Sequence, residues 1–463
     1  MDYRRGFDTL EHETAVDRLP VQGELPDWLA GTLIRNGPAV FDHHGKSFRH
    51  WFDGQAMLHR FGFADGQVSY ANHILDTPQS RALLDEGRIR YVEFATDPCA
   101  SLFGRFFTRF TRKQSQNTPV NVTHFDGRDA ALSEVAVAVQ FDPETLKTVG
   151  VVDYADDLTG TISTAHPHAE PGTGALVNYL LRYGRHSAFQ VYRQPVDSRH
   201  RELIGSVAAD LPGYLHSFAV TEWHVVLMIY PFVVNPLSFL LRGRPFIENY
   251  RWRPELGTRI VTVRLADGEQ REYQAPPCFA FHHINAFEED GDLVLDLCAF
   301  PDADVVKALY LSHLRTGEGA PVPFPTRYRI REGYVEVTRL SEQPLELPRI
   351  NYGGYHARPY RFAYGTGATD PEGRNFLDQL VKLDVTTGQV RIWGEAEKYP
   401  GEPVFVAAPT AAAEDDGVVL SVVLDAARDR SMLLVLDAMS FTELARAEVP
   451  HAIPFGFHGR FAP

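Results

Sequence analysis

The sequence predicts an all-β fold, and three observations support this prediction. Short runs rich in Val, Leu, Ile and aromatic residues alternate with Asp-Gly or Thr-Gly pairs, which supply the positive φ angles of tight hairpin turns. Patterns of long amphipathic helices are scarce. The Asp-Gly and Thr-Gly pairs are Asp65-Gly66, Asp126-Gly127, Asp267-Gly268, Thr387-Gly388 and Asp416-Gly417. The third observation is a weak internal repeat.

The repeat consists of three strand-turn-strand pieces that share an apolar-Asp-turn-apolar plan around Asp142, Asp384 and Asp437. The last two aspartates are 53 residues apart, close to the period of a propeller blade, which is about 40 to 50 residues. Seven blades would take about 66 residues each, a length that loop insertions accommodate. A β-sandwich would show the same turns and strand lengths, so the turn signals alone favour the two architectures about equally.

The composition is that of a folded, soluble protein. Hydrophobic residues make up 44% and charged residues 23% of the 463 residues, near the averages of globular proteins. No Pro/Ser-rich linker or charged block divides the chain, so one domain, residues 1–463, is expected. The formal charge of -15 opposes the binding of nucleic acid, which depends on clustered Lys and Arg. Neither nucleic acid nor a protein partner is predicted.

The compartment is predicted from cysteine usage and from the apolar runs. Cys99, Cys278 and Cys298 are too few and too scattered for a disulfide framework, which is typical of a reducing compartment. The N-terminus lacks the apolar stretch of a signal peptide. The longest apolar run, Val225 to Leu241, is shorter than the roughly 20 residues of a spanning helix and is broken by prolines. We therefore expect a cytoplasmic protein that does not cross a bilayer.

Four of the nineteen histidines lie in dense local patterns of aromatic and apolar residues. A histidine packed between aromatic side chains needs a buried partner, which is either a hydrogen-bond acceptor or a metal ion. The four are His166 in TAHPHAEP, His216 in YLHSF, His282 in CFAFHHINAFEE and His458 in PFGFHGRF.

These contexts, together with LPDWLAGTLIRNGP at residues 25–38 and HWFDGQAMLHRF at residues 50–61, resemble the carotenoid cleavage oxygenase family. The resemblance runs from about Leu19 to Phe461. It is strongest to the branch of the animal β-carotene oxygenases and the vertebrate retinoid isomerase, through DPCASLFGRFF, TAHPH, FHHINAFEEDG, LPRINY and EPVFV. Many phrases matched in the same order make the resemblance specific.

The resemblance implies a seven-bladed β-propeller with a helical and loop cap over an axial iron(II), Fe(2+), held by four histidines and no carboxylate. The implied ligands are His166, His216, His282 and His458, and the implied supporting carboxylates are Glu134, Glu346 and Glu402. Each glutamate would accept the free ring N–H of a ligand histidine and so fix its orientation. His168 and His283 adjoin two of these ligands, and strand alternation alone leaves the choice open. The family pattern places the ligand first, which selects His166 and His282.

The spacing of six of these residues agrees with the implied fold. His166, His216, His282, Glu346, Glu402 and His458 are separated by 50, 66, 64, 56 and 56 residues. Residues that recur once per blade can all point at the central axis of a propeller. A sandwich gives no reason for such a spacing.

Two stretches are expected to contact a membrane surface and to form the substrate entrance. Apolar residues recur at helical spacing from residue 102 to residue 110, with basic residues on the other face, and the broken apolar run ends near two arginines. The predicted contact residues are Leu102, Phe103, Phe106, Phe107, Val233, Val234, Leu237, Phe239 and Leu240. The expected protein is thus peripherally associated with membranes, and the alternative is an ordinary core helix and strand.

The function implied by the resemblance is cleavage of a carotenoid or apocarotenoid double bond by O₂ to give aldehydes of the retinal type. A non-oxidative retinoid isomerase would use the same iron site. Stilbene cleavage is disfavoured because the position before the first glutamate is Ser133, where stilbene-cleaving members carry a lysine. A metal-free propeller is disfavoured because all seven polar site residues are present.

Overall fold

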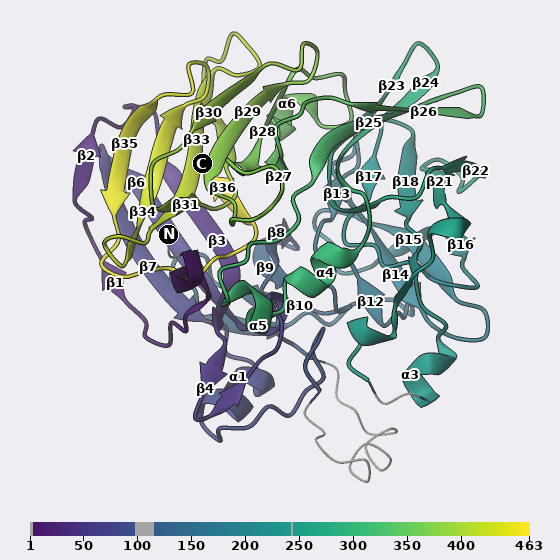
Figure 1. Cartoon of the computed structure of the whole chain (residues 1–463), viewed down its shortest axis with the longest axis horizontal. Coiled ribbons are helices and arrows are strands. Elements are labelled where there is room, and N and C mark those ends of the chain that lie inside the picture. Colours follow the sequence, from purple (N-terminus) through teal and green to yellow (C-terminus); the bar gives the residue numbers. More distant parts are fainter. Residues whose placement is uncertain (1–2, 98–114, 242–243) are drawn as a thin grey trace.

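Antiparallel hairpins dominate the structure, a computed structural model that describes residues 3–97, 115–241 and 244–463. The strands form seven sheets arranged as the blades of a propeller, with few helices, which confirms the predicted fold class. Figure 1 shows the chain passing from blade to blade around the ring, so that purple N-terminal strands lie beside yellow C-terminal ones.

Within each sheet the strands follow one another in antiparallel order. Blade 1 contains β1 (Ala15–Val16), β7 (Gln67–Ile74), β6 (Gln55–Ala64), β3 (Gly31–Val40) and β36 (Gly459–Ala462). Blade 2 contains β11 (Thr148–Val151), β10 (Ala138–Phe141), β9 (Arg128–Leu132) and β8 (Asn121–Phe125). Blade 3 contains β12 (Ile162–Ser163), β13 (His168–Ala169), β14 (Leu176–Arg182), β15 (Ala188–Gln194) and β16 (Glu202–Ala208). Blade 4 contains β17 (Ala219–Val220), β18 (His224–Ile229), β21 (Thr258–Arg264) and β22 (Gln270–Ala275).

The remaining blades follow the same plan. Blade 5 contains β23 (Phe279–Glu289), β24 (Asp292–Phe300), β25 (Phe324–Arg331) and β26 (Tyr334–Arg339). Blade 6 contains β27 (Glu346–Arg349), β28 (Phe362–Gly367), β29 (Gln379–Asp384) and β30 (Val390–Trp393). Blade 7 contains β31 (Lys398–Pro400), β32 (Val404–Ala407), β33 (Gly417–Asp425), β34 (Arg430–Asp437), β35 (Glu443–Glu448) and β2 (Val21–Gly23). Two short ribbons join β4 (Asp42–His43) to β5 (Lys46–Ser47), and β19 (Phe232–Val233) to β20 (Arg251–Trp252).

The ring is closed by strands from both ends of the chain. The C-terminal β36 pairs with β3 in blade 1, and the N-terminal β2 pairs with β35 in blade 7. Strands from opposite ends of the chain therefore share blades 1 and 7, which closes the ring of blades.

Helices are short and lie between strands. They are α1 (Pro78–Leu84), α3 (Leu237–Leu241), α4 (Asp304–Ala308), α5 (Leu311–Leu314) and α6 (Tyr352–Tyr355), with 3₁₀ turns η1 (Tyr3–Phe7), η2 (Trp51–Asp53), η3 (Ile247–Asn249) and η4 (Pro254–Leu256). Residues of η2 and α4 line a cavity that also contains His216 and His282, so these elements cap the axis. Among the helices of the described residues, none is both long and apolar enough to cross a membrane.

The predicted turn chemistry is largely confirmed. Both residues of Asp65-Gly66 and of Asp126-Gly127 have positive φ, as a two-residue hairpin turn requires. Asp416-Gly417 was predicted wrongly, because β32 and β33 are joined by the longer loop 408–416 and Gly417 already belongs to β33. The turn pairs with positive φ follow directly from local sequence, whereas this loop does not.

The internal repeat corresponds to the same hairpin in blades 2, 6 and 7. Asp384 and Asp437 end strands, and Asp142 directly follows one. Their Oδ1 atoms accept backbone N–H groups three residues later, at 2.7, 3.1 and 2.6 Å. In each case the backbone carbonyl of the aspartate also accepts an N–H four residues later. The shared sequence plan therefore encodes one turn conformation.

Candidate metal centre

Seven polar side chains converge in the structure, and each comes from a different blade. His282 lies on β23 and Glu346 begins β27. Glu134 lies between β9 and β10, and His166 lies between β12 and β13. His216 precedes β17, Glu402 lies between β31 and β32, and His458 precedes β36. Because a propeller points the same edge of every blade at its axis, one residue per blade builds a ring.

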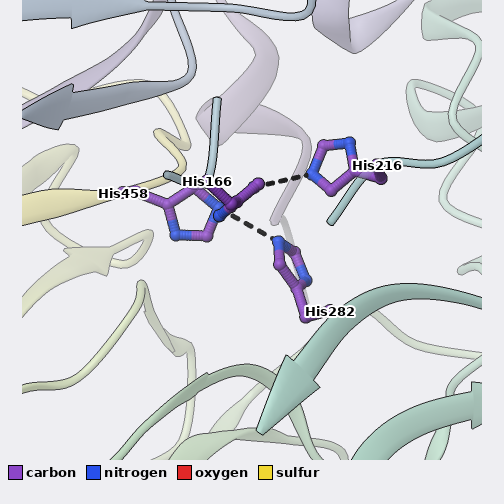
Figure 2. Close-up of side chains that lie close together, drawn as sticks. All are labelled: His166, His216, His282 and His458. Carbon is purple, nitrogen blue, oxygen red and sulfur yellow. Dashed lines mark hydrogen bonds between the residues drawn. The ribbon is translucent and has the colours of Figure 1, made fainter. Parts of the chain in front are cut away.

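The four predicted histidines form one cluster. One ring nitrogen from each of His166, His216, His282 and His458 lies within 4.8 Å of the others. The Nε2 atoms of His166 and His216 are 3.2 Å apart, and those of His282 and His458 are 3.0 Å apart, as the dashed lines in Figure 2 mark. Figure 2 shows the four imidazoles approaching a common point from different sides.

The neighbouring histidines that strand alternation could not separate point elsewhere. His168 Nε2 lies 3.1 Å from the carbonyl oxygen of Phe218, and His283 Nδ1 lies 2.8 Å from Ser217 Oγ. Neither belongs to the cluster found among the described residues. The first histidine of each pair is thus the one that faces the centre.

Each of three clustered histidines is held by one of the predicted glutamates. His216 Nδ1 donates to Glu134 at 2.6 Å, His282 Nδ1 to Glu346 at 2.7 Å, and His458 Nδ1 to Glu402 at 2.6 Å. A carboxylate acceptor places the ring proton on Nδ1, which leaves the Nε2 lone pair directed at the centre. The glutamates therefore orient the histidines without entering the cluster themselves.

The three carboxylates have different surroundings. Burial opposes ionisation of Glu402, but Arg349, His458 and Arg35 outweigh it and hold the pKa of its carboxyl well below its usual range. Arg35 Nη1 donates to one oxygen of Glu402, and Arg349 Nε donates to the other at 2.7 Å. Burial raises the pKa of Glu346 to about 7. A positive ion at the centre would favour the charged form of that carboxyl.

The donor set fits a metal cation. Burial lowers the pKa of His166 and His282 well below the usual value, and that of His458 to about 3, so these rings are neutral. The Nδ1–H groups of His282 and His458 donate to Glu346 and Glu402, so the Nε2 atom of each ring carries a lone pair. These two Nε2 atoms are 3.0 Å apart. Facing lone pairs repel each other unless a proton or a cation lies between them. Four neutral imidazoles can hold a divalent transition metal, and the uncancelled charge is offset by the glutamates behind them.

Backbone contacts between blades position the first two histidines. The hydroxyl of Thr164 donates to the carbonyl oxygen of His216 and accepts the backbone N–H of His166 at 3.1 Å. Asn178 Nδ2 in turn donates to the Thr164 carbonyl oxygen at 3.0 Å. The relative placement of His166 and His216 is therefore fixed by one threonine between blades 3 and 4.

Two apolar cavities flank the cluster and meet at Phe52. The first, of about 70 Å³, is bounded by His216 and His282 and by aromatic side chains. The second, of about 350 Å³, is bounded by Glu134 on the other side of His216. The ring of Phe52 lies 5.8 Å from the His216 ring. An elongated apolar ligand that occupied both cavities would pass beside His216 and His282.

Several residues of the site were not singled out from sequence. Arg35 and Arg349 hold Glu402, and Tyr214 Oη donates to Glu134 Oε1. A signal was present, since Arg35 lies in LIRNGP, Arg349 in LPRINY and Tyr214 in YLHSF.

The predicted membrane contacts are only partly placed. Leu102, Phe103, Phe106 and Phe107 lie outside the described residues, as does the side chain of Leu240. The prediction that Val233 and Val234 contact a membrane is wrong, since they are 7% and 0% exposed. The reason is that β19 pairs with β20 and packs into the core. Leu237 is 60% exposed, and Phe239 stacks on Phe246.

Replacing Glu346 by Gln tests the role of the glutamates. The amide can still accept from His282 Nδ1, but it lacks the negative charge that offsets a cation. We expect the affinity for a divalent metal to fall by about 10- to 100-fold, the usual effect of losing a group behind a ligand. Glu342→Gln, whose side chain is 84% exposed, is the control and should bind metal normally. Competition with a chelator measures both, and equal affinities would contradict the assignment.

Comparison with known proteins agrees with this architecture. Residues 7–463 match the family described as retinal pigment epithelial membrane protein. The mitochondrial carotenoid-cleaving dioxygenase of Mustela putorius furo is 33% identical, over 98% of this chain and 95% of the relative. The carotenoid isomerooxygenase of Galleria mellonella is 32% identical, over 96% of this chain and 93% of the relative.

Solved structures show the same likeness. Cobalt-substituted Synechocystis ACO superposes with a TM-score of 0.88 at 26% identity, covering 100% of this chain and 98% of that one. A mutant of Synechocystis apocarotenoid oxygenase superposes with a TM-score of 0.89 at the same identity and coverage. The shared fold, the near-complete match and the four-histidine centre show that this chain belongs to the retinal pigment epithelial membrane protein family of carotenoid oxygenases.

Proposed function

We propose that the protein is an iron(II)-dependent dioxygenase that cleaves a conjugated double bond of a carotenoid or apocarotenoid with O₂. The products would be aldehydes of the retinal type, each carrying one oxygen atom from O₂. The observation that carries the proposal is the cluster of four imidazoles next to two largely apolar cavities. Relatives named carotenoid-cleaving dioxygenase support the same activity.

The ligand set favours iron(II) for this role. Neutral imidazoles suit ferrous iron, and four of them leave coordination positions open. Iron bound to His166, His216, His282 and His458 would supply the activation of O₂. The protein's own contribution is to fix the rings of His216, His282 and His458 through Glu134, Glu346 and Glu402, while Thr164 positions the backbone of His166.

The cavities would determine which bond reacts. Phe281 and Phe457 directly precede the ligands His282 and His458 in sequence, and both line the first cavity. Their side chains and Phe52 present an apolar wall beside the centre, which suits a rigid hydrocarbon chain. A polyene held against this wall has one double bond nearest the metal position, so regioselectivity follows from depth of insertion.

Phenolic stilbenes suit the site poorly. Ser133 lies beside Glu134 and lines the second cavity, but its hydroxyl already donates to the carbonyl oxygen of Asn117 at 3.0 Å. A serine cannot help to ionise a phenol as a lysine can. A polyene without a phenol is therefore the better candidate substrate.

Incubation of the iron-loaded protein with β-carotene and with apocarotenals under ¹⁸O₂ tests the proposal. We expect one O₂ consumed per polyene cleaved, and mass spectrometry should find ¹⁸O in both aldehyde fragments when their exchange with water is kept short. The protein stripped of metal is the control and should give no product. Turnover without O₂ uptake would contradict cleavage and indicate isomerisation.

Peripheral binding to a membrane is part of the proposal, because carotenoids are almost insoluble in water. Phe239 on α3 stacks on Phe246, which lines the second cavity, with ring centroids 5.6 Å apart. Exposed Leu237 on the same helix therefore lies near a route from the surface to the cavity. An exposed apolar side chain of this kind can insert reversibly into the lipid headgroup region.

Leu237→Glu should weaken binding to anionic liposomes and slow turnover of liposome-embedded substrate, with little change for detergent-dispersed substrate. A carboxylate is disfavoured both by apolar lipid and by a negative surface. Leu203→Glu, at a 51% exposed leucine on β16, is the matched control. Sedimentation with liposomes measures binding, and equal effects of the two variants would contradict a membrane role for α3.

A further inference from the structure

The second cavity contains a polar feature that the oxidative chemistry does not use. Most of its described lining is apolar and includes Val92, Phe94, Val120 and Phe246. A cavity for a pure hydrocarbon would be expected to lack polar side chains with spare hydrogen-bonding capacity, since burying such groups is costly. The described lining nevertheless includes five polar residues, which are Glu93, Asn117, Ser133, Glu134 and Thr161.

Four of the five have other roles or other surroundings. Asn117 Oδ1 accepts the backbone N–H of Ala56 at 2.9 Å, and its Nδ2 donates to the Gly54 carbonyl oxygen at 2.8 Å. Ser133 donates to the Asn117 carbonyl oxygen. Thr161 is exposed to solvent. Glu134 is bound to His216 and Tyr214.

Glu93 is the remaining polar side chain of the described lining. It is only 8% exposed. Its Oε1 accepts from Gln79 Nε2, while Gln79 Oε1 accepts from Ser115 Oγ at 2.5 Å and Ser115 Oγ accepts the Asn117 backbone N–H at 2.9 Å. This chain of hydrogen bonds fixes the orientation of the Gln79 amide, which in turn holds Glu93 in place against the cavity.

The protonation state of Glu93 suits contact with a neutral oxygen. Burial, with a smaller contribution from the charge of Asp53, raises the pKa of the Glu93 carboxyl to about 8. At neutral pH the carboxyl is therefore mostly protonated, and it offers an O–H donor as well as an acceptor. A neutral carboxyl can sit in an apolar cavity and still donate to a hydroxyl or carbonyl oxygen.

We propose that Glu93 is a specificity-determining residue that binds an oxygen-bearing group of the substrate, either a ring hydroxyl or a chain aldehyde. This inference rests on the proposed function of the same site. The substrate class is then an oxygenated polyene, namely a hydroxylated carotenoid or an apocarotenal, in preference to a pure hydrocarbon. A hydrocarbon end in this cavity would leave the Glu93 hydrogen bond unmade, which costs affinity.

The test compares Glu93→Leu with the unchanged protein on β-carotene, its ring-hydroxylated derivative and an apocarotenal. We expect kcat/KM for at least one oxygenated polyene to fall by about 10- to 100-fold, through KM, because one buried hydrogen bond is lost. The value for β-carotene should stay the same or rise. Glu93→Gln retains a donor and an acceptor of the same size, and it should keep most of the preference.

Binding measured without turnover separates this inference from the proposed cleavage. Under anaerobic conditions, quenching of tryptophan fluorescence gives the affinity of the iron-loaded full chain for each polyene. A preference for oxygenated polyenes that Glu93→Leu abolishes would support the inference even if no cleavage occurred. Equal losses for all three polyenes, or no loss for any, would overturn it and leave Glu93 as a structural partner of Gln79. Circular dichroism and the Glu93→Gln variant check that the fold is retained.

Discussion

Replacing His282 by Ala is expected to remove most of the bound metal and nearly all oxygenase turnover. His282 supplies one of four Nε2 atoms, and its Nδ1 is bound to Glu346. Loss of a ligand should cost more than the roughly 10- to 100-fold that follows loss of a group behind one. The change also leaves Glu346 buried without its histidine partner, which weakens the site further.

His283→Ala is the matched control, because it removes the same side chain from the next residue of β23. His283 contacts Ser217 and does not belong to the four-histidine cluster. Metal content by mass spectrometry and turnover of an apocarotenoid should remain near normal in this variant. Full metal content in His282→Ala, or its loss in His283→Ala, would contradict the assignment of the two neighbours.

The hairpins could be predicted from sequence because their chemistry is local. Asp142, Asp384 and Asp437 each accept backbone N–H groups within the same short turn. The choice between a propeller and a sandwich could not be made from such turns. It depends on closure of the ring by β36 on β3 and by β2 on β35, which joins segments from opposite ends of the chain. Local patterns carry no information about such long-range pairing.

The candidate site likewise has features that local sequence predicts and features that depend on residues far apart in the chain. The four histidines could be recognised from the aromatic and apolar residues around them. The family resemblance indicated which histidine of each close pair faces the centre. Arg35 was missed because its partner Glu402 is 367 residues away in the sequence. Val233 and Val234 were misplaced because an apolar run predicts burial in protein or in lipid equally well. The pairing of β19 with β20 in the structure shows that this segment belongs to the protein core.

The buried ion cluster around Glu402 should make a large contribution to stability. Arg35 and Glu402 are 7% and 0% exposed at their side chains, and Arg349 binds the other oxygen of Glu402. Removing one partner of a buried ion pair leaves a charge without compensation in a medium that solvates it poorly. Arg35→Ala is therefore expected to lower the free energy of unfolding by about 3–5 kcal/mol.

An exposed pair provides the comparison. Arg81 and Asp76 form an ion pair with side chains 59% and 58% exposed, so Arg81→Ala should cost no more than about 1 kcal/mol. Urea denaturation followed by tryptophan fluorescence measures both variants. Similar midpoints for the two would show that the Glu402 cluster contributes no more than a surface pair.

A double variant separates the charge of Glu402 from the packing of Arg35. In Arg35→Ala with Glu402→Gln, no uncompensated carboxylate remains, so the combined loss of stability should be smaller than the sum of the single losses. Metal affinity should respond differently, because His458 donates to Glu402 and the amide removes the charge behind that ligand. We therefore expect the double variant to regain stability relative to Arg35→Ala while binding metal as weakly as Glu402→Gln alone. Normal metal affinity in the double variant would contradict the role of the Glu402 charge in metal binding.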